Sequence, residues 1–175
     1  MNSRVILVDE QDNPIGTMPK LEAHEKGLLH RAFSIFVFNS KGEMLIQKRS
    51  ATKYHTPGLW TNACCSHQVE GEREEIFLSR RLREEMGLEV KSFQKAFQFT
   101  YRAEFNNGLI EHELDHVYYA NSDQEPSPNP DEVEEWQYIS TVELRTRIAK
   151  QPQLFTPWFK LLFEPVMAKM PLQTR

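Results

Sequence analysis

The sequence predicts an α/β fold that forms a single domain over residues 1–175. Runs rich in β-branched and aromatic residues, which favour strands, alternate along the chain with segments whose apolar residues recur at helical spacing. The chain has 175 residues, 39% of them hydrophobic, and can therefore bury one sizeable core. It contains no internal repeat and no long low-complexity segment.

The composition restricts the partners and the compartment that we expect. The formal net charge of -4 provides no bulk attraction to nucleic acid or to an anionic membrane surface. The two cysteines are adjacent, so they offer no disulfide framework and favour a reducing compartment. The N-terminus lacks a signal-peptide pattern, and no apolar run is long enough to span a bilayer. We therefore expect a cytoplasmic protein, monomeric or weakly dimeric, that binds neither nucleic acid nor membrane.

The N-terminal third predicts a hairpin, a short helix and two strands. Residues 5–9 and 15–18 are the hairpin strands, because the sequence DNP between them marks a turn. The segment LEAHEKG follows Lys20, carries His24 and predicts a short helix. The run HRAFSIFVFN, which begins at His30, predicts a strand buried on both faces. After a turn at NSKG, the segment EMLIQKRS predicts the next strand.

A helix predicted before Gly87 carries both an apolar stripe and a carboxylate at its edge. The apolar residues at four-residue spacing are Leu78, Leu82 and Met86. Glu85 projects about 20° around the axis from the first of them, where a lone carboxylate would be costly to desolvate. Arg81, one turn earlier, could supply the counter-charge. The alternative is an ordinary ion pair on a solvated helix face.

The segment GLIEHELDHVYY predicts a strand that carries a row of acids, and residues 90–102 before it predict one or two more strands. A period of two places Glu111, Glu113 and Asp115 on one face. Neighbouring carboxylates about 7 Å apart would repel by roughly 2 kcal/mol at an effective dielectric near 20. A bound cation would relieve this repulsion. The alternative is a face open to water, where screening makes the row harmless.

The C-terminal third predicts a strand at residues 133–138, after a proline-rich acidic loop, and then two helices. The capping-box pattern at residues 140–143 predicts a helix through Ala149. The Thr-Pro pair at residues 156–157 predicts the start of a second helix. We expect Pro165 to kink or end that helix.

The region around the central helix resembles the signature of Nudix proteins, which is a glycine, a glutamate, and then Arg-Glu-apolar-any-Glu-Glu-any-Gly. The residues that fit this register are Glu72, Arg80, Leu82, Glu84, Glu85 and Gly87. Ser66 stands where the first glycine is expected, and Arg81 stands where the hydrolases of the family carry a metal-binding glutamate. The cation Arg81 in place of that carboxylate favours binding of a phosphate group over its hydrolysis.

Four motifs are similar to those of type 1 isopentenyl-diphosphate isomerases, a Nudix branch in which serine also occurs at the position of Ser66. They are GLLHRAF, TNACCSH, EHELDH and TPWFK, and the resemblance runs from Lys20 to about Trp158. It implies an α/β Nudix fold with a mixed central sheet between helices. It also implies a metal-dependent isomerase of isoprenoid biosynthesis that interconverts isopentenyl and dimethylallyl diphosphates.

The resemblance implies two metal sites. One holds a divalent ion, Mn²⁺, Mg²⁺ or Zn²⁺, on three imidazoles and two carboxylates, a donor set that suits such ions. The corresponding residues are His24, His30, His67, Glu111 and Glu113. The other holds Mg²⁺ between Glu85, the carbonyl of Cys65 and the substrate diphosphate. Without the resemblance, isolated histidines are more often surface or hydrogen-bonded residues than ligands.

The resemblance also implies an acid and a base, because moving a double bond requires protonating one carbon and deprotonating another. Glu113, hydrogen-bonded by Tyr101, would protonate the terminal alkene carbon, and Cys65 would take the proton from carbon 2. The face of Trp158 would stabilise the positive intermediate in an apolar pocket without a charged partner. In isolation, Cys65 would be a small buried residue and Trp158 a core filler.

Four cations complete the expected site, because a diphosphate suits a cluster of point and forked donors. They are Lys20, Arg49, Lys53 and Arg81. On their own, Arg49 and Lys53 would be solubilising charges. Two other functions stay open: a Nudix diphosphate hydrolase, which Arg81 disfavours, and a non-catalytic diphosphate-binding module, which would not require Cys65.

Overall fold

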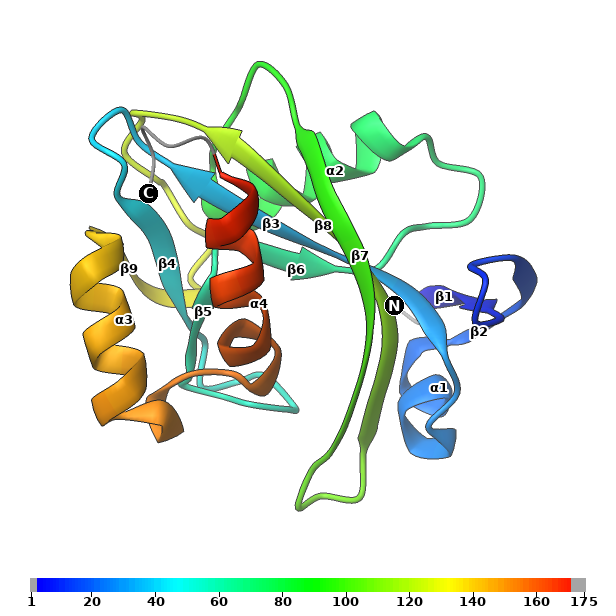
Figure 1. Ribbon diagram of the computed structural model, residues 1–175. Coiled ribbons are helices and arrows are strands. Elements are labelled where there is room, and N and C mark those ends of the chain that lie inside the picture. The colour runs from blue at the N-terminus through cyan, green and yellow to red at the C-terminus, as the bar shows by residue number, and fades with distance from the viewer. Residues whose placement is uncertain (1–2, 171–175) are drawn as a thin grey trace.

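The structure, a computed structural model, describes residues 3–170 and has the predicted α/β architecture, with a mixed sheet between helices (Figure 1). Its elements are β1 (Arg4–Val8), β2 (Pro14–Pro19), α1 (Lys20–Lys26), β3 (His30–Phe38), β4 (Met44–Arg49), β5 (Trp60–Asn62), β6 (Cys64–Ser66), α2 (Glu74–Met86), β7 (Gln94–Glu104), β8 (Ile110–Asn121), β9 (Val133–Ile139), α3 (Thr141–Lys150), a 3₁₀ turn (Pro152–Leu154) and α4 (Pro157–Lys169). The predicted hairpin, strands and helices are all present, within a few residues of the expected bounds. In the described part of the chain, no helix is long and apolar enough to cross a membrane.

Strand β3 is the centre of the sheet. It pairs antiparallel with β1, β4 and β6, and parallel with β8 from His30–Glu113 to Phe38–Asn121. Strand β8 in turn pairs with β7, and β4 pairs with β5 and β9. A parallel pair needs a long crossover, and here the crossover from β3 to β8 contains β4 to β7 and α2. This crossover brings β6 and β8 to the two edges of β3.

Both faces of β3 are buried, as its sequence predicts. Side chains alternate between the faces of a strand. Phe33, Ile35 and Val37 pack in one core cluster with α2 residues, and Phe36 and Phe38 pack in the other with α4 residues. Figure 1 shows α2 on one side of the sheet and α3 and α4 on the other. The site described below lies on the α4 side.

Helix α2 ends at Gly87, which adopts a left-handed conformation with φ 63°. The predicted stripe is buried, and it consists of Leu78, Leu82 and Met86. Beyond the helix end, the backbone N–H of Ser127 donates to the Met86 carbonyl, and that of Asn129 donates to the Glu85 carbonyl. The loop before β9 therefore packs directly on the C-terminal turn of α2.

The C-terminal helices begin at the predicted caps. The Ser140 hydroxyl accepts from the backbone N–H of Glu143, and Thr156 caps α4 in the same way. Helix α4 does not end at Pro165 but continues to Lys169. Pro165 has no backbone N–H to donate to the carbonyl of Leu161, and this turn of the helix faces solvent, since the Leu161 side chain is 55% exposed. Burial of the next turn, which carries Val166, maintains the helix.

We predict that Gly87→Ala lowers the free energy of unfolding more than Gly108→Ala does. Both glycines have positive φ, so alanine at either position carries a backbone penalty of about 1–2 kcal/mol. At Gly87 the added Cβ would also lie 2.3 Å from the Ser127 carbonyl oxygen, whereas at Gly108 it would meet nothing within 4 Å. Urea unfolding measures both losses. Equal losses would show that the Ser127 contact contributes nothing.

Candidate active site

A cleft on the α4 side of the sheet brings most of the predicted site residues together. Nine of them line it: Lys20, Arg49, Lys53, Cys65, His67, Arg81, Glu111, Glu113 and Trp158. The cleft has only about 50 Å³ of open space. A wider groove of about 740 Å³ beside α1 shares Lys20 with it but contains none of the other predicted residues. The chemical groups therefore lie in the smaller and better enclosed of the two.

Four predicted metal ligands form a cluster. They are His24 from α1, His30 from the start of β3, His67 from the end of β6, and Glu113 from β8. One ligand atom from each lies within 4.8 Å of the others. The His24 Nδ1 is 2.7 Å from the Lys20 carbonyl oxygen, and the His30 Nδ1 is 2.9 Å from that of Leu28. These carbonyls hold the proton on Nδ1, which leaves the Nε2 lone pairs free to bind a metal.

The chemistry of these residues fits a divalent metal. The Nε2 atoms of His24 and His30 are buried and have no hydrogen-bond partner within residues 3–170. Burial lowers the pKa of His24 to about 4 and that of His67 to about 3, so both rings are neutral at pH 7. Burial opposes ionisation of Glu113, but His30, whose Nε2 lies 3.5 Å from the Glu113 Oε1, and the hydrogen bond from His67 outweigh it and hold the pKa of Glu113 well below the usual range. For His30, the same interaction with Glu113 outweighs burial and raises the pKa.

Glu111 lies outside this cluster. Its Oε1 is 2.8 Å from the His55 Nε2, and its Oε2 accepts a hydrogen bond of 2.9 Å from the Tyr101 hydroxyl. Burial, and then the charge of Glu113, raise the pKa of Glu111. Of the five predicted metal ligands, four therefore lie together, and Glu111 instead contacts His55 and Tyr101.

The predicted hydrogen bond from Tyr101 to Glu113 is wrong. Tyr101 is paired with Glu113 across the β7–β8 ladder, but its hydroxyl reaches the diagonal neighbour Glu111. A long side chain readily reaches a diagonal neighbour in an antiparallel pair, and Glu113 is already engaged by two histidines. Tyr101 thus contacts the other glutamate of the pair.

The acidic row on β8 is buried. Glu111 is 4% exposed, Glu113 is 9% exposed and Asp115 is 3% exposed. The alternative of a face open to water is therefore wrong, because screening by water requires access to it. Each carboxyl group instead has a polar partner from another element: Tyr101 for Glu111, His67 for Glu113, and Ser34 for Asp115.

Cys65 meets three polar groups in the cleft. The indole N–H of Trp158 donates to its sulfur over 3.1 Å, its thiol donates to the Asn62 Oδ1 over 3.2 Å, and the Ser34 Oγ lies 3.6 Å away. Burial, followed by the charge of Asp115, raises the pKa of Cys65. The free protein therefore carries a neutral thiol at this position.

The expectation of an apolar pocket around Trp158 is wrong. The guanidinium of Arg49 lies 5.5 Å from the centroid of the indole ring, and polar or charged residues line most of the cleft. The reason is that the predicted phosphate-binding cations line the same small cleft as Cys65 and Glu113. The indole face is therefore already paired with a cation in the free protein.

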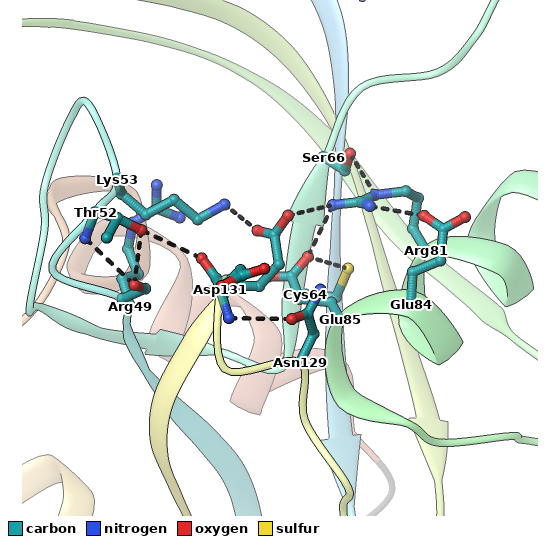
Figure 2. Close-up of polar contacts among 12 residues, drawn as sticks. Arg49, Thr52, Lys53, Cys64, Ser66, Arg81, Glu84, Glu85, Asn129 and Asp131 are labelled. Atoms are coloured by element: carbon teal, nitrogen blue, oxygen red, sulfur yellow. Dashed lines mark hydrogen bonds and ion pairs between the residues drawn. The ribbon is translucent and has the colours of Figure 1, made fainter. Parts of the chain in front are cut away.

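Two of the four predicted phosphate-binding cations, Lys53 and Arg81, form ion pairs inside the protein. Lys53 forms an ion pair with Glu132, and Arg81 lies 4.0 Å from the same carboxylate. In Figure 2, Lys53 extends from its loop and Arg81 extends from α2, and the two point toward one another. Arg81 also contacts Glu84 at 2.8 Å and Glu85 at 3.3 Å.

Glu85 is held in a fixed position. It is 2% exposed, so the alternative of a solvated surface pair with Arg81 is wrong. Its Oε1 accepts from the Gln47 amide at 2.8 Å. Its Oε2 accepts from the Cys64 thiol at 3.3 Å, as Figure 2 shows. A carboxylate fixed beside the cation cluster could hold Mg²⁺.

Sequence reasoning missed three groups in or beside the cleft. Ser34 gave no signal, because it lies within an apolar strand. Glu132 is one of several acids in a polar loop. His55 offered a signal, because a histidine follows Lys53 in the loop that ends at Trp60, but its partner Glu111 lies 56 residues away.

Comparisons with known proteins agree with this architecture. The NUDIX domain family model matches residues 28–159. A protein of Photorhabdus laumondii named isopentenyl-diphosphate Delta-isomerase 2 is 49% identical over 160 residues, covering 91% of this chain and 90% of its own. The protein of the same name from Aromatoleum aromaticum is 46% identical over 168 residues, covering 96% and 88%.

Solved structures show the same fold. A crystal structure from Deinococcus radiodurans superposes with a TM-score of 0.76 at 24% identity, covering 93% of this chain and 98% of that one. A MutT protein from Methanosarcina mazei superposes with a TM-score of 0.65 at 17% identity, covering 80% and 94%. At these identities the similarity concerns the fold alone.

We predict that His24→Ala weakens binding of Mn²⁺ by on the order of 100-fold, because one ligand of a four-residue cluster is lost. Titration of the purified protein, followed by the electron paramagnetic resonance of free Mn²⁺, measures the affinity. His112→Ala is the matched control, since this histidine contacts the Gly27 carbonyl and is not part of the cluster. Equal affinities for the two variants would remove His24 from the metal site.

We predict that Glu132→Gln tightens binding of inorganic diphosphate about fivefold, because a competing carboxylate between Lys53 and Arg81 loses its charge. Isothermal titration calorimetry at fixed ionic strength measures this. Glu134→Gln, which affects a surface contact with Lys48, is the control and should leave the affinity unchanged. Weaker binding by the Glu132 variant would mean that this carboxylate helps to bind the anion.

Proposed function

This chain belongs to the NUDIX family and, within it, to the isopentenyl-diphosphate Delta-isomerases, and on this premise we propose that it interconverts isopentenyl and dimethylallyl diphosphates. The observation that carries the proposal is that Cys65 and Glu113 line one cleft from strands on opposite edges of β3. Those strands lie two strand spacings, about 10 Å, apart across β3, and Cys65 and Glu113 pair with Ser34 and His30, which lie on the same face of β3.

Metal binding supports the acid–base role of Glu113. We propose that the cluster residues His24, His30, His67 and Glu113 hold one divalent ion, and that Glu111 joins them by leaving His55. When bound, this ion supplies positive charge that fixes the carboxyl group and tunes its acidity. The ordered imidazole nitrogens described above support this assignment, and Mn²⁺, Mg²⁺ and Zn²⁺ all suit the donor set.

The two proton-transfer groups exchange roles with the direction of the reaction. For isopentenyl diphosphate, Glu113 gives a proton to the terminal alkene carbon, and the thiolate of Cys65 removes one from carbon 2. In the reverse direction, the Cys65 thiol protonates carbon 2, and the Glu113 carboxylate removes a methyl proton. The pair therefore needs one transferable proton, whichever substrate is bound.

Each direction of the reaction starts from a different position of this proton: on Glu113 for isopentenyl diphosphate, and on Cys65 for dimethylallyl diphosphate. Each turnover leaves the proton on the opposite partner, so exchange with water must restore the starting form.

The cation cluster suits the diphosphate. We propose that Lys20, Arg49, Lys53 and Arg81 hold it, with Mg²⁺ at Glu85. Because the cleft has only about 50 Å³ of open space, Lys53 must leave Glu132 when the substrate enters.

Movement of Arg49 toward the diphosphate would prepare the hydrocarbon end of the cleft. Its guanidinium covers the Trp158 indole in the free protein. Once it turns to the anion, the ring face becomes available to the tertiary cation of the intermediate. Binding of the diphosphate would thereby be coupled to stabilisation of the intermediate.

Three assignments rest on composition and stay as proposals. They are a single domain over residues 1–175, a cytoplasmic location, and a monomer or weak dimer. The adjacent free cysteines suit a reducing compartment.

We predict that the protein, incubated with isopentenyl diphosphate and Mg²⁺ in deuterated water, forms dimethylallyl diphosphate that contains deuterium in a methyl group. Cys65→Ala should lower the turnover number by at least about 1000-fold while keeping the fold and Mn²⁺ binding, because the second proton-transfer group is lost. Nuclear magnetic resonance follows the product, and circular dichroism checks the fold.

The same experiment separates the other functions. Release of inorganic phosphate would identify a hydrolase, and binding without turnover would identify a binding module. Near-native isomerisation by Cys65→Ala would remove the thiol from the mechanism.

A further inference from the structure

Asp115 is the one acid of the β8 row that the proposed reaction does not use. It is almost completely buried, and its Oδ2 accepts a hydrogen bond of 2.7 Å from the Ser34 hydroxyl. Its Oδ1 has no hydrogen-bond partner in the described part of the chain. Burial of a carboxyl group with one hydrogen bond is unfavourable. Fold stability therefore does not explain an acid at this position.

Ser34 connects Asp115 to the reactive thiol. It lies on β3, directly opposite Cys65 in the β3–β6 pair, and its Oγ is 3.6 Å from the sulfur. Asp115 approaches the same hydroxyl from the other edge of β3, on the parallel neighbour β8. One hydroxyl group thus lies between the carboxyl group and the sulfur, on the face of the sheet that forms the cleft.

The position of this pair on the sheet is also informative. On β3 the same face continues with Phe36, and on β8 it continues with Val117, both of which belong to the core under α4. Ser34 and Asp115 are therefore the last polar residues before the apolar core begins. Ser34 contacts the sulfur from the sheet side, and both Ser34 and Asp115 are almost completely buried.

The other contacts of the sulfur come from different directions. Trp158 donates from α4, and the Asn62 oxygen accepts from the thiol. The Asn62 amide nitrogen donates to the carbonyls of Ile35 and Cys64, so its oxygen cannot turn away. Ser34 supplies the remaining contact, and its single hydrogen can serve either Asp115 or Cys65.

We propose that Ser34 and Asp115 are positioning residues for the Cys65 thiol: the carboxyl group fixes the Ser34 hydroxyl, and the hydroxyl fixes the sulfur at the wall of the cleft. This inference rests on the isomerase function proposed above. Proton transfer to carbon depends on placement of the reacting groups to within about 0.5 Å. Without the contact to Ser34, the Cys65 thiol can still transfer a proton, but its sulfur is no longer held in position at the wall of the cleft.

The test compares Ser34→Ala and Asp115→Leu with Asp115→Asn, which keeps the size of the side chain and a hydrogen bond to Ser34. The first two should lower kcat about tenfold, because the sulfur loses the contact that places it, with KM within twofold of the wild type. Asp115→Asn should keep kcat within about threefold, since the amide replaces the lost contact.

A second measurement does not depend on turnover. The rate of alkylation of Cys65 by iodoacetamide, in the protein without substrate, reports the placement and accessibility of the sulfur. Tandem mass spectrometry separates it from the buried Cys64. We expect the rate to change severalfold in Ser34→Ala and Asp115→Leu and to stay near the wild-type rate in Asp115→Asn.

Val8→Ala is the control, because Val8 is a buried residue of β1 in a core cluster that does not include Cys65. It should lower the melting temperature and leave kcat and the alkylation rate unchanged. The proposal fails if Ser34→Ala keeps both quantities at the wild-type values, or if Asp115→Asn is as impaired as Ser34→Ala. If Asp115→Leu does not fold, these two variants still decide the question.

The two proposals can fail separately. A wild-type protein that alkylates as expected but does not isomerise isopentenyl diphosphate would refute the proposed function. In that case the alkylation rates of the variants would still decide whether Ser34 and Asp115 position the thiol.

Discussion

The burial of three acids on one face of β8 is the constraint on which the rest of the cleft depends. Carboxyl groups removed from water need polar partners nearby. Here the partners come from β3, β6, β7 and the loop between β4 and β5, so elements far apart in sequence must converge on one strand. The residues that meet this need are Ser34, His67, Tyr101 and His55. The same convergence gathers the imidazoles of the proposed metal site.

The cations on the other wall of the cleft need negative partners, just as the buried acids need polar ones. Arg81 and Lys53 are partly shielded from water, and Glu132 lies between them. Internal ion pairs let these cations remain in the folded protein without a ligand. A bound diphosphate would replace one set of negative charges with another, so that binding need not desolvate the cations again. Stability of the free protein and affinity for an anion thus use the same groups.

The sheet also fixes the relative positions of the strands that carry the two proposed proton-transfer groups. Cys65 and Glu113 lie on the two neighbours of β3, and the spacing of strands in a sheet varies little. The contacts around the sulfur come from three elements, which include α4 through Trp158. A rigid sheet combined with contacts from α4 can hold a small alkene more precisely than a mobile loop could.

The sequence by itself determined the helices and strands and identified most of the polar residues of the site. The apolar stripe of α2, its end at Gly87 and the acidic row on β8 all follow from spacing within about ten residues, and family motifs pointed to Cys65 and Glu113. Only the tertiary structure decided which atoms meet. Tyr101 reaches Glu111 rather than the glutamate opposite it, and Asp115 reaches a serine 81 residues away. The physical reason is that periodicity gives the face on which a side chain lies, whereas its partner depends on the reach and competition of groups that only the folded sheet brings together.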